Sequence, residues 1–356
     1  NSAMDGYAVR AADLPADGVV EFPVPGTSWA GRPWLAAIEP GQAVQIMTGG
    51  MMPEGADTVI MQEHVEREGD TVRIGGGHKP GQNVRAAGED VTTGATVFTA
   101  GKRLTSADIG VLASLGFAEV TVYRRPRVAF FSTGDELRGV GEPLGPGEIY
   151  DSNRYTLFAM LKRLDVEIND MGVVRDKREL IEQAFREAAA SADAIITSGG
   201  VSVGEADFVK QTLEALGSMS FWKIAMKPGR PVTFGHIDDA VFFGLPGNPV
   251  SVMVTFFQFV RSALLKMSGE ADPQPIYTVM AHTTSALRKR PGRYEFQRGV
   301  LEQSAPGEFT VRSAGAQGSG ILRSMSEANC FILLEPDQSG IKAGQPVLVQ
   351  PFQNLI

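Results

Sequence analysis

Continuous apolar runs alternate with amphipathic segments between residues 127 and 267. Runs without polar interruption are typical of strands covered on both faces. Their alternation with helices predicts an α/β domain with a doubly wound, mostly parallel central sheet and right-handed crossovers. Ser152 is expected to cap the first helix. The predicted strands are 128–132, 166–174, 194–197, 221–225, 232–234 and 241–244, and the predicted helices are 153–164, 178–190, 206–216 and a segment after Asn248.

The flanking regions lack this alternation. Short β-branched runs between glycine and proline turns, at 44–47 and 58–61, predict a β-rich N-terminal domain, and one helical stretch, 106–115, marks a connecting segment. Short strands at 277–281, 295–300, 309–311, 330–334 and 346–349 predict a small closed or sandwich-like β domain. We therefore expect an N-terminal β-rich domain (1–88), a connecting domain (89–125), an α/β domain (126–274) and a C-terminal β domain (275–356).

Composition excludes several classes of protein. With 43% hydrophobic and 21% charged residues the chain is not of the disordered type. The formal net charge of −8 argues against a nucleic-acid partner. A single cysteine, Cys330, allows no internal disulfide and fits a reducing compartment, most simply the cytoplasm. The long apolar stretch 240–265 contains Pro246, Gln258 and Arg261, so we interpret it as core rather than as a membrane span.

Polar and glycine-rich loops follow three of the predicted parallel strands, at the edge of the sheet where ligands bind in open α/β folds. The first loop, 132–136, places small hydroxyl residues and a glycine before two acids. The loop either leaves room for a ligand beside hydrogen-bond donors or is a turn that carries solvated carboxylates.

The second loop, 197–207, contains Gly199, Gly200 and Gly204 immediately before a predicted helix. Glycines permit positive φ and close backbone approach, and free amides before a helix bind anions such as phosphate. The spacing is neither a dinucleotide-binding fingerprint nor a Walker P-loop. Glu205 and Asp207 either stabilise the helix dipole or hold Mg²⁺ beside the phosphates, and we favour the metal.

The third loop is the rigid Pro-Gly-Asn-Pro sequence at 246–249, which alone is equally well explained as a strand-to-helix turn. Three cations lie close together in the sequence of this acidic chain: Lys223, Lys227 and Arg230. They predict an oxyanion site rather than a solvated basic edge strand. The histidines lie outside all three loops, so covalent catalysis by a Ser-His-Asp triad is not expected. The combination favours metal-assisted phosphoryl chemistry.

Several motifs along the whole chain resemble those of the MoeA-type molybdopterin molybdenumtransferases, which are related to the E domains of gephyrin-like proteins. The matching motifs are Asn-Ser-Ala-Met-Asp-Gly-Tyr-Ala at 1–8, Ile-Met-Thr-Gly at 46–49, Gly-Glu-Asp at 88–90, Ser-Thr-Gly-Asp-Glu at 132–136, Ile-Tyr-Asp-Ser-Asn at 149–153, Ser-Gly-Gly-Val-Ser-Val-Gly-Glu-Ala-Asp at 198–207 and Leu-Pro-Gly-Asn-Pro at 245–249. The first and the sixth are the most specific.

The resemblance implies the last step of molybdenum cofactor synthesis. Adenylylated molybdopterin would bind, its phosphoanhydride would be hydrolysed with Mg²⁺, AMP would leave, and molybdenum from molybdate would enter the dithiolene. It also implies a homodimer, whose site forms between the N-terminal β domain of one protomer and the α/β domain of the other. Molybdopterin adenylyltransferase and molybdoenzymes are further expected partners.

The resemblance also assigns roles to individual residues. Mg²⁺ or the attacking water would be held by Glu136, Asp176 and Asp207. Two further catalytic residues would be Lys223 and Lys227. Molybdate would be held by Lys227, Arg298 and Ser319. By residue type alone, Arg298 and Ser319 would be expected at the surface. The predicted substrate-binding residues are Asp5, Thr48, Asp90, Thr133, Ser198, Gly199, Gly200, Ser202, Gly204, Pro246, Gly247 and Asn248; turn capping is the alternative role for Asp5 and Thr48.

Two other functions stay open at this point: a molybdopterin adenylyltransferase, and a non-catalytic E-domain-like binding or scaffold module. The flanking β domains and the Val-Ser that follows Gly200 argue against the first, and the retained acids and lysines argue against the second. The chain opens at Asn1 inside a motif, so we expect further N-terminal residues in the intact protein. The resemblance implies that they belong to an elongated dimerisation domain, and that the connecting, dimerisation domain 89–125 is incomplete here.

Overall fold

A computed structural model describes residues 1–200, 208–273, 275–353 and 355–356. The chain divides into two compact units, Asn1–Thr99 and Ala100–Ile356, and each is described by itself. The predicted residues Ser202, Gly204, Glu205 and Asp207 lie outside the described part.

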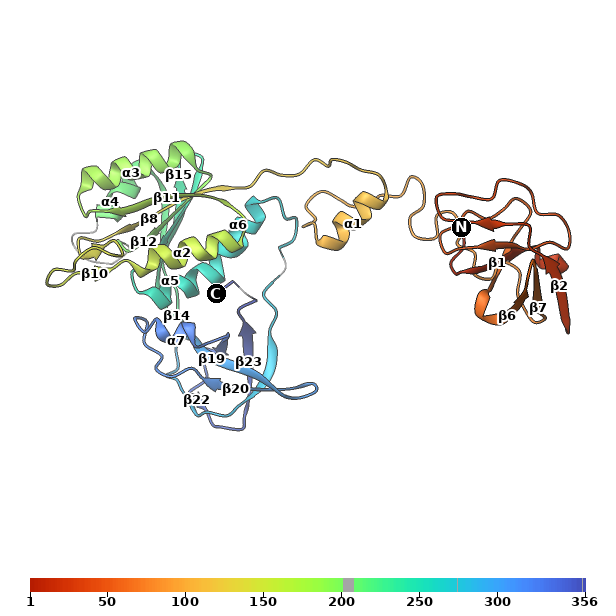
Figure 1. The fold of residues 1–356 in the computed structure, drawn as a ribbon. Coiled ribbons are helices and arrows are strands. Elements are labelled where there is room, and N and C mark those ends of the chain that lie inside the picture. The colour runs from red at the N-terminus through yellow and green to blue at the C-terminus, as the bar shows by residue number, and fades with distance from the viewer. Residues whose placement is uncertain (201–207, 274, 354) are drawn as a thin grey trace. The chain divides into compact units, whose positions relative to one another are not determined.

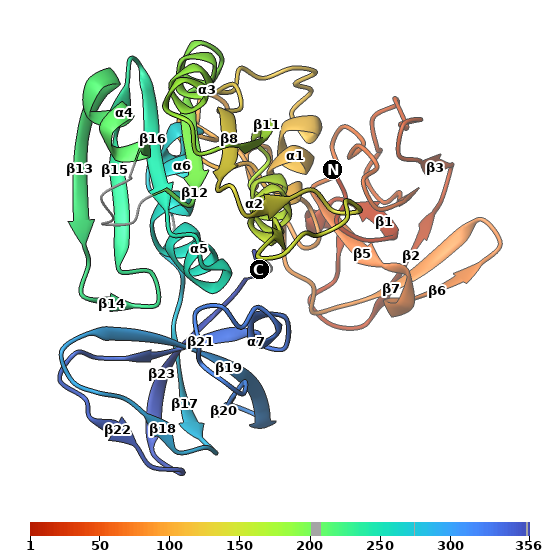
Figure 2. The ribbon, with the colours of Figure 1, turned by 90° about the vertical axis from the view of Figure 1, so that its left-hand side faces the viewer.

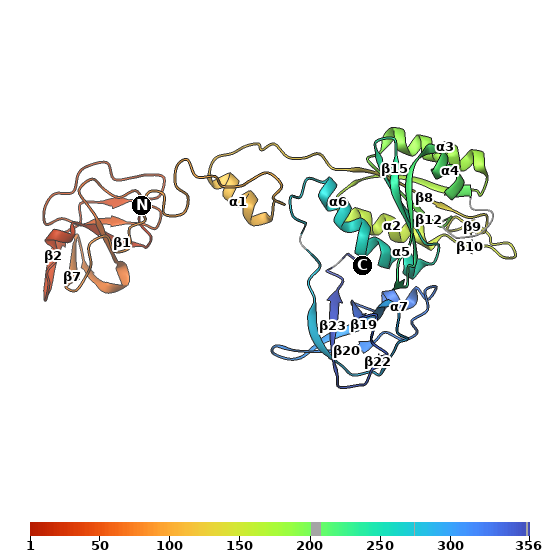
Figure 3. The same cartoon turned by 180° about the vertical axis from the view of Figure 1, so that it is seen from behind.

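The N-terminal unit is built from two small sheets, which confirms its β-rich character (Figure 3). One sheet has the strand order β3-β4-β1-β5 and the other β2-β7-β6, and a shared apolar core includes Tyr7, Phe22 and Ile60. The elements are β1 (Gly6–Val9), η1 (Ala11–Asp13), β2 (Val19–Pro23), β3 (Thr27–Ser28), β4 (Val44–Ile46), β5 (Thr58–Met61), η2 (Gln62–His64), β6 (Val65–Glu68) and β7 (Thr71–Gly75).

A six-stranded sheet forms the centre of the second unit. Its order is β11-β8-β12-β16-β15-β13, and β15 alone among these strands runs against the others, so the sheet is mostly parallel as predicted (Figure 2). The strands are β8 (Arg127–Thr133), β11 (Glu167–Val174), β12 (Ala194–Ser198), β13 (Gly217–Lys223), β15 (Pro231–Ile237) and β16 (Ala240–Leu245). The strand predicted at 221–225 spans Gly217–Lys223, so it begins directly after α4 and ends before the predicted boundary.

Helices cover both faces of this sheet (Figure 1). Alternate residues of β8 separate two cores: Val128 and Phe130 pack with α2 and α5, whereas Ala129 and Phe131 pack with α3 and α4. The doubly wound arrangement predicted from the apolar runs is thus confirmed. The helices of the unit are α1 (Ser106–Ser114), α2 (Ser152–Arg163), α3 (Arg178–Ser191), α4 (Phe208–Leu216), α5 (Pro249–Thr255), the π-helical turn η3 (Phe256–Val260), α6 (Arg261–Met267) and α7 (Arg323–Ser326).

The segment that follows β16 is a core helix. Together α5, η3 and α6 form a 19-residue helix, Pro249–Met267, which is long and apolar enough to cross a membrane. However, 61% of its most apolar window is buried inside the protein. The helix packs against the sheet through side chains such as Val252, Phe256 and Leu264.

The C-terminal strands close into a small barrel, because β19 pairs with both β20 and β21 in the order β19-β20-β17-β23-β21. Of the two predicted forms, closed and sandwich-like, the closed form is confirmed. The residues of β21 alternate between two cores. One set packs inside the barrel, and the other set packs against the core of the α/β domain. The short or barrel strands are β9 (Leu137–Arg138), β10 (Ile149–Tyr150), β14 (Met226–Lys227), β17 (Val279–Thr283), β18 (Leu287–Arg288), β19 (Tyr294–Ala305), β20 (Glu308–Ser313), β21 (Cys330–Leu334), β22 (Gly340–Ile341) and β23 (Pro346–Pro351).

Asp193 fixes the chain where it enters β8. Its carboxylate accepts hydrogen bonds from the guanidinium of Arg124 at 2.6 and 2.8 Å, and from the amide of Arg127 at 2.8 Å. Hydrogen bonding from Arg124 is the largest cause of a pKa for Asp193 well below its ordinary value, and desolvation partly opposes it. A carboxyl group with a lowered pKa stabilises the fold above its ordinary pKa near 3.8, and this contribution is lost as the pH falls.

Replacing Asp193 with asparagine should therefore lower the free energy of unfolding at pH 7 by about 1–2 kcal/mol. The difference from the parent should shrink as the pH approaches 2. Urea denaturation at both pH values measures this. The matched control is Asp165→Asn, which removes an exposed ion pair with Arg125 and should change stability by less than about 0.5 kcal/mol. Equal losses in the two variants would contradict the role given to Asp193.

Candidate functional site

A cavity of about 730 Å³ opens at the carboxyl-terminal edge of the central sheet. Its walls are the ends of β8, β12 and β16, the start of α2, and Gly320 and Leu322 from the C-terminal domain. Three loops singled out from the sequence thus meet in one place, as expected for an open parallel sheet. Among the predicted residues, those that line the cavity are Thr133, Glu136, Asp176, Ser198, Gly199, Gly200, Pro246, Gly247 and Asn248.

The described glycines of the second loop, Gly199 and Gly200, which we call the glycine loop, lie directly against the end of β8. Gly199 and Gly200 have positive φ of 89° and 65°. A Cβ on Gly199 would lie 2.6 Å from the carbonyl oxygen of Thr133, and one on Gly200 would lie 2.8 Å from the Thr133 hydroxyl. The Thr133 hydroxyl is buried and has no hydrogen-bond partner among the described residues. Glycine is required here for both conformation and space, and an unpaired hydroxyl faces the same loop.

Replacing Gly199 with alanine should lower the free energy of unfolding by about 2 kcal/mol, because the left-handed backbone and the contact with Thr133 are both unfavourable for a Cβ atom. Gly247 offers a matched control in the next loop, since a Cβ there would meet its nearest atom at 3.7 Å. Chemical denaturation of the two variants measures the difference. An unchanged stability of Gly199→Ala would contradict this account of the loop.

Carboxylates gather on one side of the cavity. Glu136 and Asp176 both line it, and the amide of Asp176 donates to the Asp135 carboxylate at 3.3 Å. Desolvation, followed by the negative charges of Asp135 and Glu136, raises the pKa of Asp176. In residues 1–200, 208–273, 275–353 and 355–356, no group of three or more His, Cys, Asp or Glu is arranged to hold a metal ion. Asp207, the third predicted ligand, lies outside these ranges.

The start of α2 contributes two polar residues that sequence reasoning did not select as site residues. Asp151, rather than the predicted Ser152, caps the helix, and its carboxylate accepts from the amide of Arg154 at 3.1 Å. Asn153 donates from its side-chain nitrogen to the carbonyl of Gly247 at 2.7 Å. Both residues line the cavity and are buried. The Ile-Tyr-Asp-Ser-Asn motif was the available signal.

The predicted lysines lie outside the lining of this cavity. Lys227 is in β14, which pairs with β19, and its ammonium lies 3.3 Å from the carboxylate of Glu295. Glu295 is buried, with 4% of its side chain exposed, whereas Lys227 is half-exposed. Lys223, at the end of β13, is exposed. The charge of Lys227 is therefore paired with a residue 68 positions away, which the sequence pattern did not indicate.

Arg298 is buried, with 1% of its surface exposed, so the expectation of a surface residue from its type is wrong. Its guanidinium donates to the carbonyls of Ala316 and Gly318 at 3.2 and 2.9 Å and to the hydroxyl of Ser324 at 3.0 Å. Burial lowers the pKa of Arg298 to about 10. The carbonyl of Ser319, in the loop that Arg298 holds, accepts from the amide of Val250 at 3.1 Å.

The remaining predicted residues lie in the N-terminal unit. The Asp5 carboxylate accepts from the Thr48 amide at 2.6 Å and from the Thr48 hydroxyl at 2.8 Å. These bonds, the backbone one first, lower the pKa of Asp5. Asp90 is exposed. The structure thus brings Asp5 and Thr48 together within their unit, in a geometry that also serves to fix a turn.

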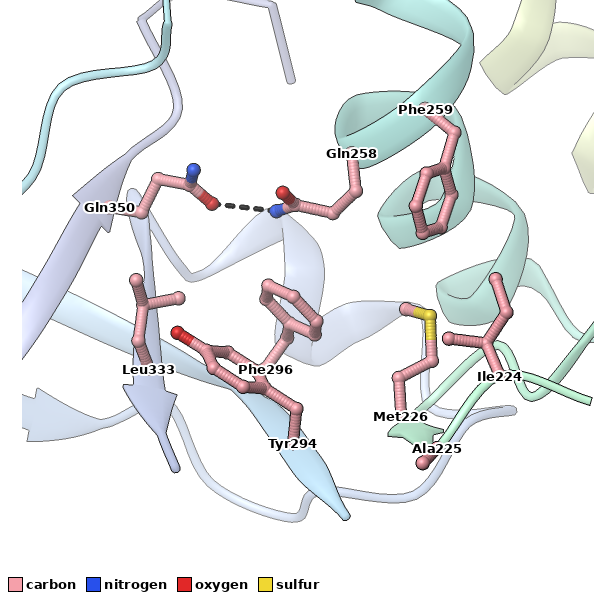
Figure 4. A pocket seen from close by; sticks show the side chains of 9 residues that line it. All are labelled: Ile224, Ala225, Met226, Gln258, Phe259, Tyr294, Phe296, Leu333 and Gln350. Atoms are coloured by element: carbon pink, nitrogen blue, oxygen red, sulfur yellow. Dashed lines mark hydrogen bonds between the residues drawn. The ribbon is translucent and has the colours of Figure 1, made fainter. Parts of the chain in front are cut away.

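A second cavity of about 400 Å³ lies between η3, the segment 224–226 and the barrel strands (Figure 4). Its walls are mostly apolar, with Phe259 and Phe296 among them, and the side chain of Gln258 donates to that of Gln350 at 2.6 Å. None of its lining residues is charged, so this cavity does not suit a phosphate or a divalent ion.

Similarity to known proteins shows the family to which this chain belongs. The MoeA N-terminal region (domains I and II) matches residues 1–116, a probable molybdopterin binding domain matches 129–266, and the MoeA C-terminal region (domain IV) matches 280–352. A molybdopterin molybdenumtransferase of Haemophilus influenzae is 46% identical over 357 aligned residues, which cover 100% of this chain and 88% of that protein. The chain belongs to the MoeA family of molybdopterin molybdenumtransferases.

Other relatives agree with the MoeA assignment. A molybdopterin molybdenumtransferase of Nostoc is 38% identical over 98% of this chain and 82% of its own length. A gephyrin of Dictyostelium discoideum is 32% identical and is covered over 56% of its length. Among solved structures, a MoeA protein of Pyrococcus horikoshii matches with a TM-score of 0.82 and 30% identity, over 99% of this chain and 87% of that one. The predicted family and fold class are therefore confirmed.

Proposed function

We propose that this protein inserts molybdenum from molybdate into adenylylated molybdopterin, with hydrolysis of the phosphoanhydride and release of AMP. The observation that carries the proposal is the cavity at the sheet edge, in which a glycine loop, buried unpaired polar atoms and two carboxylates meet in a chain of the MoeA family. These are the parts that binding and cleaving a phosphate-linked ligand require.

The glycine loop is the proposed phosphate site. The positive-φ backbone at Gly199 and Gly200 would turn amide groups toward an oxyanion, and the Thr133 hydroxyl beside them is available as a donor. Ser198 is buried with its hydroxyl 3.0 Å from that of Ser132 and so fixes the ends of the two strands that carry the loops. Ser202 and Gly204 would extend this site.

The carboxylates fit a divalent cation. Partial desolvation and two nearby acids raise the pKa of Asp176, although the residue is still exposed, and a cation would relieve the repulsion between these acids. Carboxylate oxygens are the ligands that Mg²⁺ takes together with substrate phosphates, so Glu136, Asp176 and Asp207 are proposed to hold it. When bound, Mg²⁺ would neutralise charge on the phosphoanhydride. The same carboxylates would orient the water that attacks phosphorus as AMP departs.

Molybdate is proposed to bind at Lys227, with Arg298 and Ser319, and Lys223 adds positive charge nearby in the chain. Lys227 keeps nearly half of its side chain exposed while paired to Glu295, so its ammonium remains accessible to an oxyanion. Ser319 belongs to the loop next to Gly320, which lines the sheet-edge cavity.

A cytoplasmic homodimer is the proposed setting. Large apolar side chains are exposed along the connecting segment, including Phe117, Val122 and Tyr123, and a second copy that covers them would remove this surface from water. Following the family resemblance, Asp5, Thr48 and Asp90 of the partner copy would complete the substrate site. Molybdopterin adenylyltransferase would supply the substrate and molybdoenzymes would receive the product.

The test uses the purified full chain with adenylylated molybdopterin, molybdate and Mg²⁺. We expect AMP release that depends on Mg²⁺, together with molybdenum bound to the pterin product. Formation of adenylylated pterin from molybdopterin and MgATP without molybdate would instead identify an adenylyltransferase. Binding of the substrate without AMP release under any of these conditions would identify a non-catalytic module.

A further inference from the structure

Two buried hydrogen-bond acceptors at the start of α2 have no partner among the described residues. They are Oδ2 of Asp151 and Oδ1 of Asn153, and both residues line the sheet-edge cavity. Asp151 is 2% exposed and Asn153 is 8% exposed. Unpaired buried acceptors destabilise a fold. Their presence beside a cavity therefore indicates a ligand that supplies hydrogen-bond donors.

Each of the two side chains uses one atom to hold the local backbone. One carboxylate oxygen of Asp151, Oδ1, accepts from the Arg154 amide as the helix cap, which leaves Oδ2. The side-chain nitrogen of Asn153 donates to the Gly247 carbonyl. Because that carbonyl accepts and cannot donate, it fixes which end of the Asn153 amide is nitrogen, and the free end is the oxygen. Both remaining atoms are therefore acceptors.

A pair of acceptor atoms would bind the phosphate end and the heterocycle end of the substrate differently. Phosphate oxygens are acceptors and would be repelled by a carboxylate, so the phosphates belong at the glycine loop instead. The adenine base edge offers one amino donor next to a ring nitrogen that accepts. A 2-amino-4-oxopteridine offers two adjacent N–H donors, the 2-amino group and N3–H, which match acceptor oxygens.

We propose that Asp151 and Asn153 bind the 2-amino and N3–H edge of the pterin ring and so select a pteridine over other bases at this end of the cavity. The inference rests on the proposed function, since it assigns the heterocycle of the same substrate. It makes both residues specificity-determining and gives the Ile-Tyr-Asp-Ser-Asn motif a role beyond helix capping.

The experiment measures binding of two fluorescent probes, a 2-amino-4-oxopteridine with a side-chain phosphate and its analogue without the 2-amino group, to the full chain. AMP is the third ligand. The variant is Asp151→Asn, which preserves the cap because asparagine caps as well as aspartate but removes the second carboxylate acceptor. Asp151→Ser, another good cap residue, is the second variant. Asp239→Asn, at an exposed turn before β16, is the charge-matched control.

We expect the parent and Asp239→Asn to bind the amino probe about tenfold more tightly than its analogue. Both Asp151 variants should lose that preference, and AMP should bind within about twofold of the parent. Retention of the preference in either folded Asp151 variant would overturn the inference and leave the proposed function intact. The inference would also be overturned if an Asp151 variant lost as much affinity for AMP as for the amino probe. A parent that binds none of the three ligands would contradict the proposed function and this inference together.

Discussion

Replacing Asp176 with asparagine is expected to slow AMP release by about 100-fold or more, because the charge proposed to hold the cation or orient water is lost while the side-chain size is kept. Asp176 lines the cavity with Glu136, and desolvation and nearby acids raise its pKa more than a backbone hydrogen bond with Asp135 lowers it. Single-turnover measurement of AMP release at saturating Mg²⁺ gives the rate. The same loss is expected for Glu136→Gln.

The control for this prediction is Asp135→Asn. Like Glu136 and Asp176, Asp135 is exposed, but it does not line the cavity. Among the described residues, its carboxylate accepts a hydrogen bond only from the Asp176 amide. Its replacement should change the rate of AMP release by less than about threefold, since it removes the same charge without removing a cavity residue. If Asp135→Asn were as slow as Asp176→Asn, a general electrostatic effect of this loop would replace the proposed specific role.

Replacing Arg298 with methionine is expected to lower the free energy of unfolding by about 3 kcal/mol. The change leaves the carbonyls of Ala316 and Gly318 and the hydroxyl of Ser324 without the guanidinium that donates to all three. Urea denaturation measures the effect. Arg312→Met, at an exposed position in β20, is the matched control and should change stability by less than about 0.5 kcal/mol.

This prediction separates two roles for Arg298. Its contacts hold the loop 316–320, whereas the family resemblance places it at molybdate. Unchanged stability of Arg298→Met, with molybdate insertion abolished, would contradict the positioning role and favour direct contact with the oxyanion. A fall in the stability of Arg298→Met, with molybdate insertion retained by the folded protein, would favour the positioning role.

The sheet could be predicted from the sequence because local and tertiary preferences agree there. Residues 128–132 and 194–197 are apolar without interruption, and a strand with such a pattern is stable only when it is covered on both faces. The glycine loop could be predicted for a similar reason, since Gly199 and Gly200 take the positive φ that glycine permits.

Features that depend on distant partners were not accessible in the same way. Nothing in the sequence near Lys227 indicates that Glu295 pairs with it, and nothing near Arg298 indicates that its donors are used by carbonyls some twenty residues away. Asp151 was missed because Ser152 is an equally good cap by type, and only backbone geometry places Asp151 outside the helix. The domain boundaries and the roles of individual site residues stay predictions.

The most direct measurement is a crystal structure of the full chain with adenylylated molybdopterin, molybdate and Mg²⁺. We expect phosphate oxygens against Gly199, Gly200 and Thr133, the metal at Glu136 and Asp176, and the pterin edge at Asp151. A ligand bound in the apolar cavity beside Phe259 and Phe296, with the sheet-edge cavity empty, would contradict it.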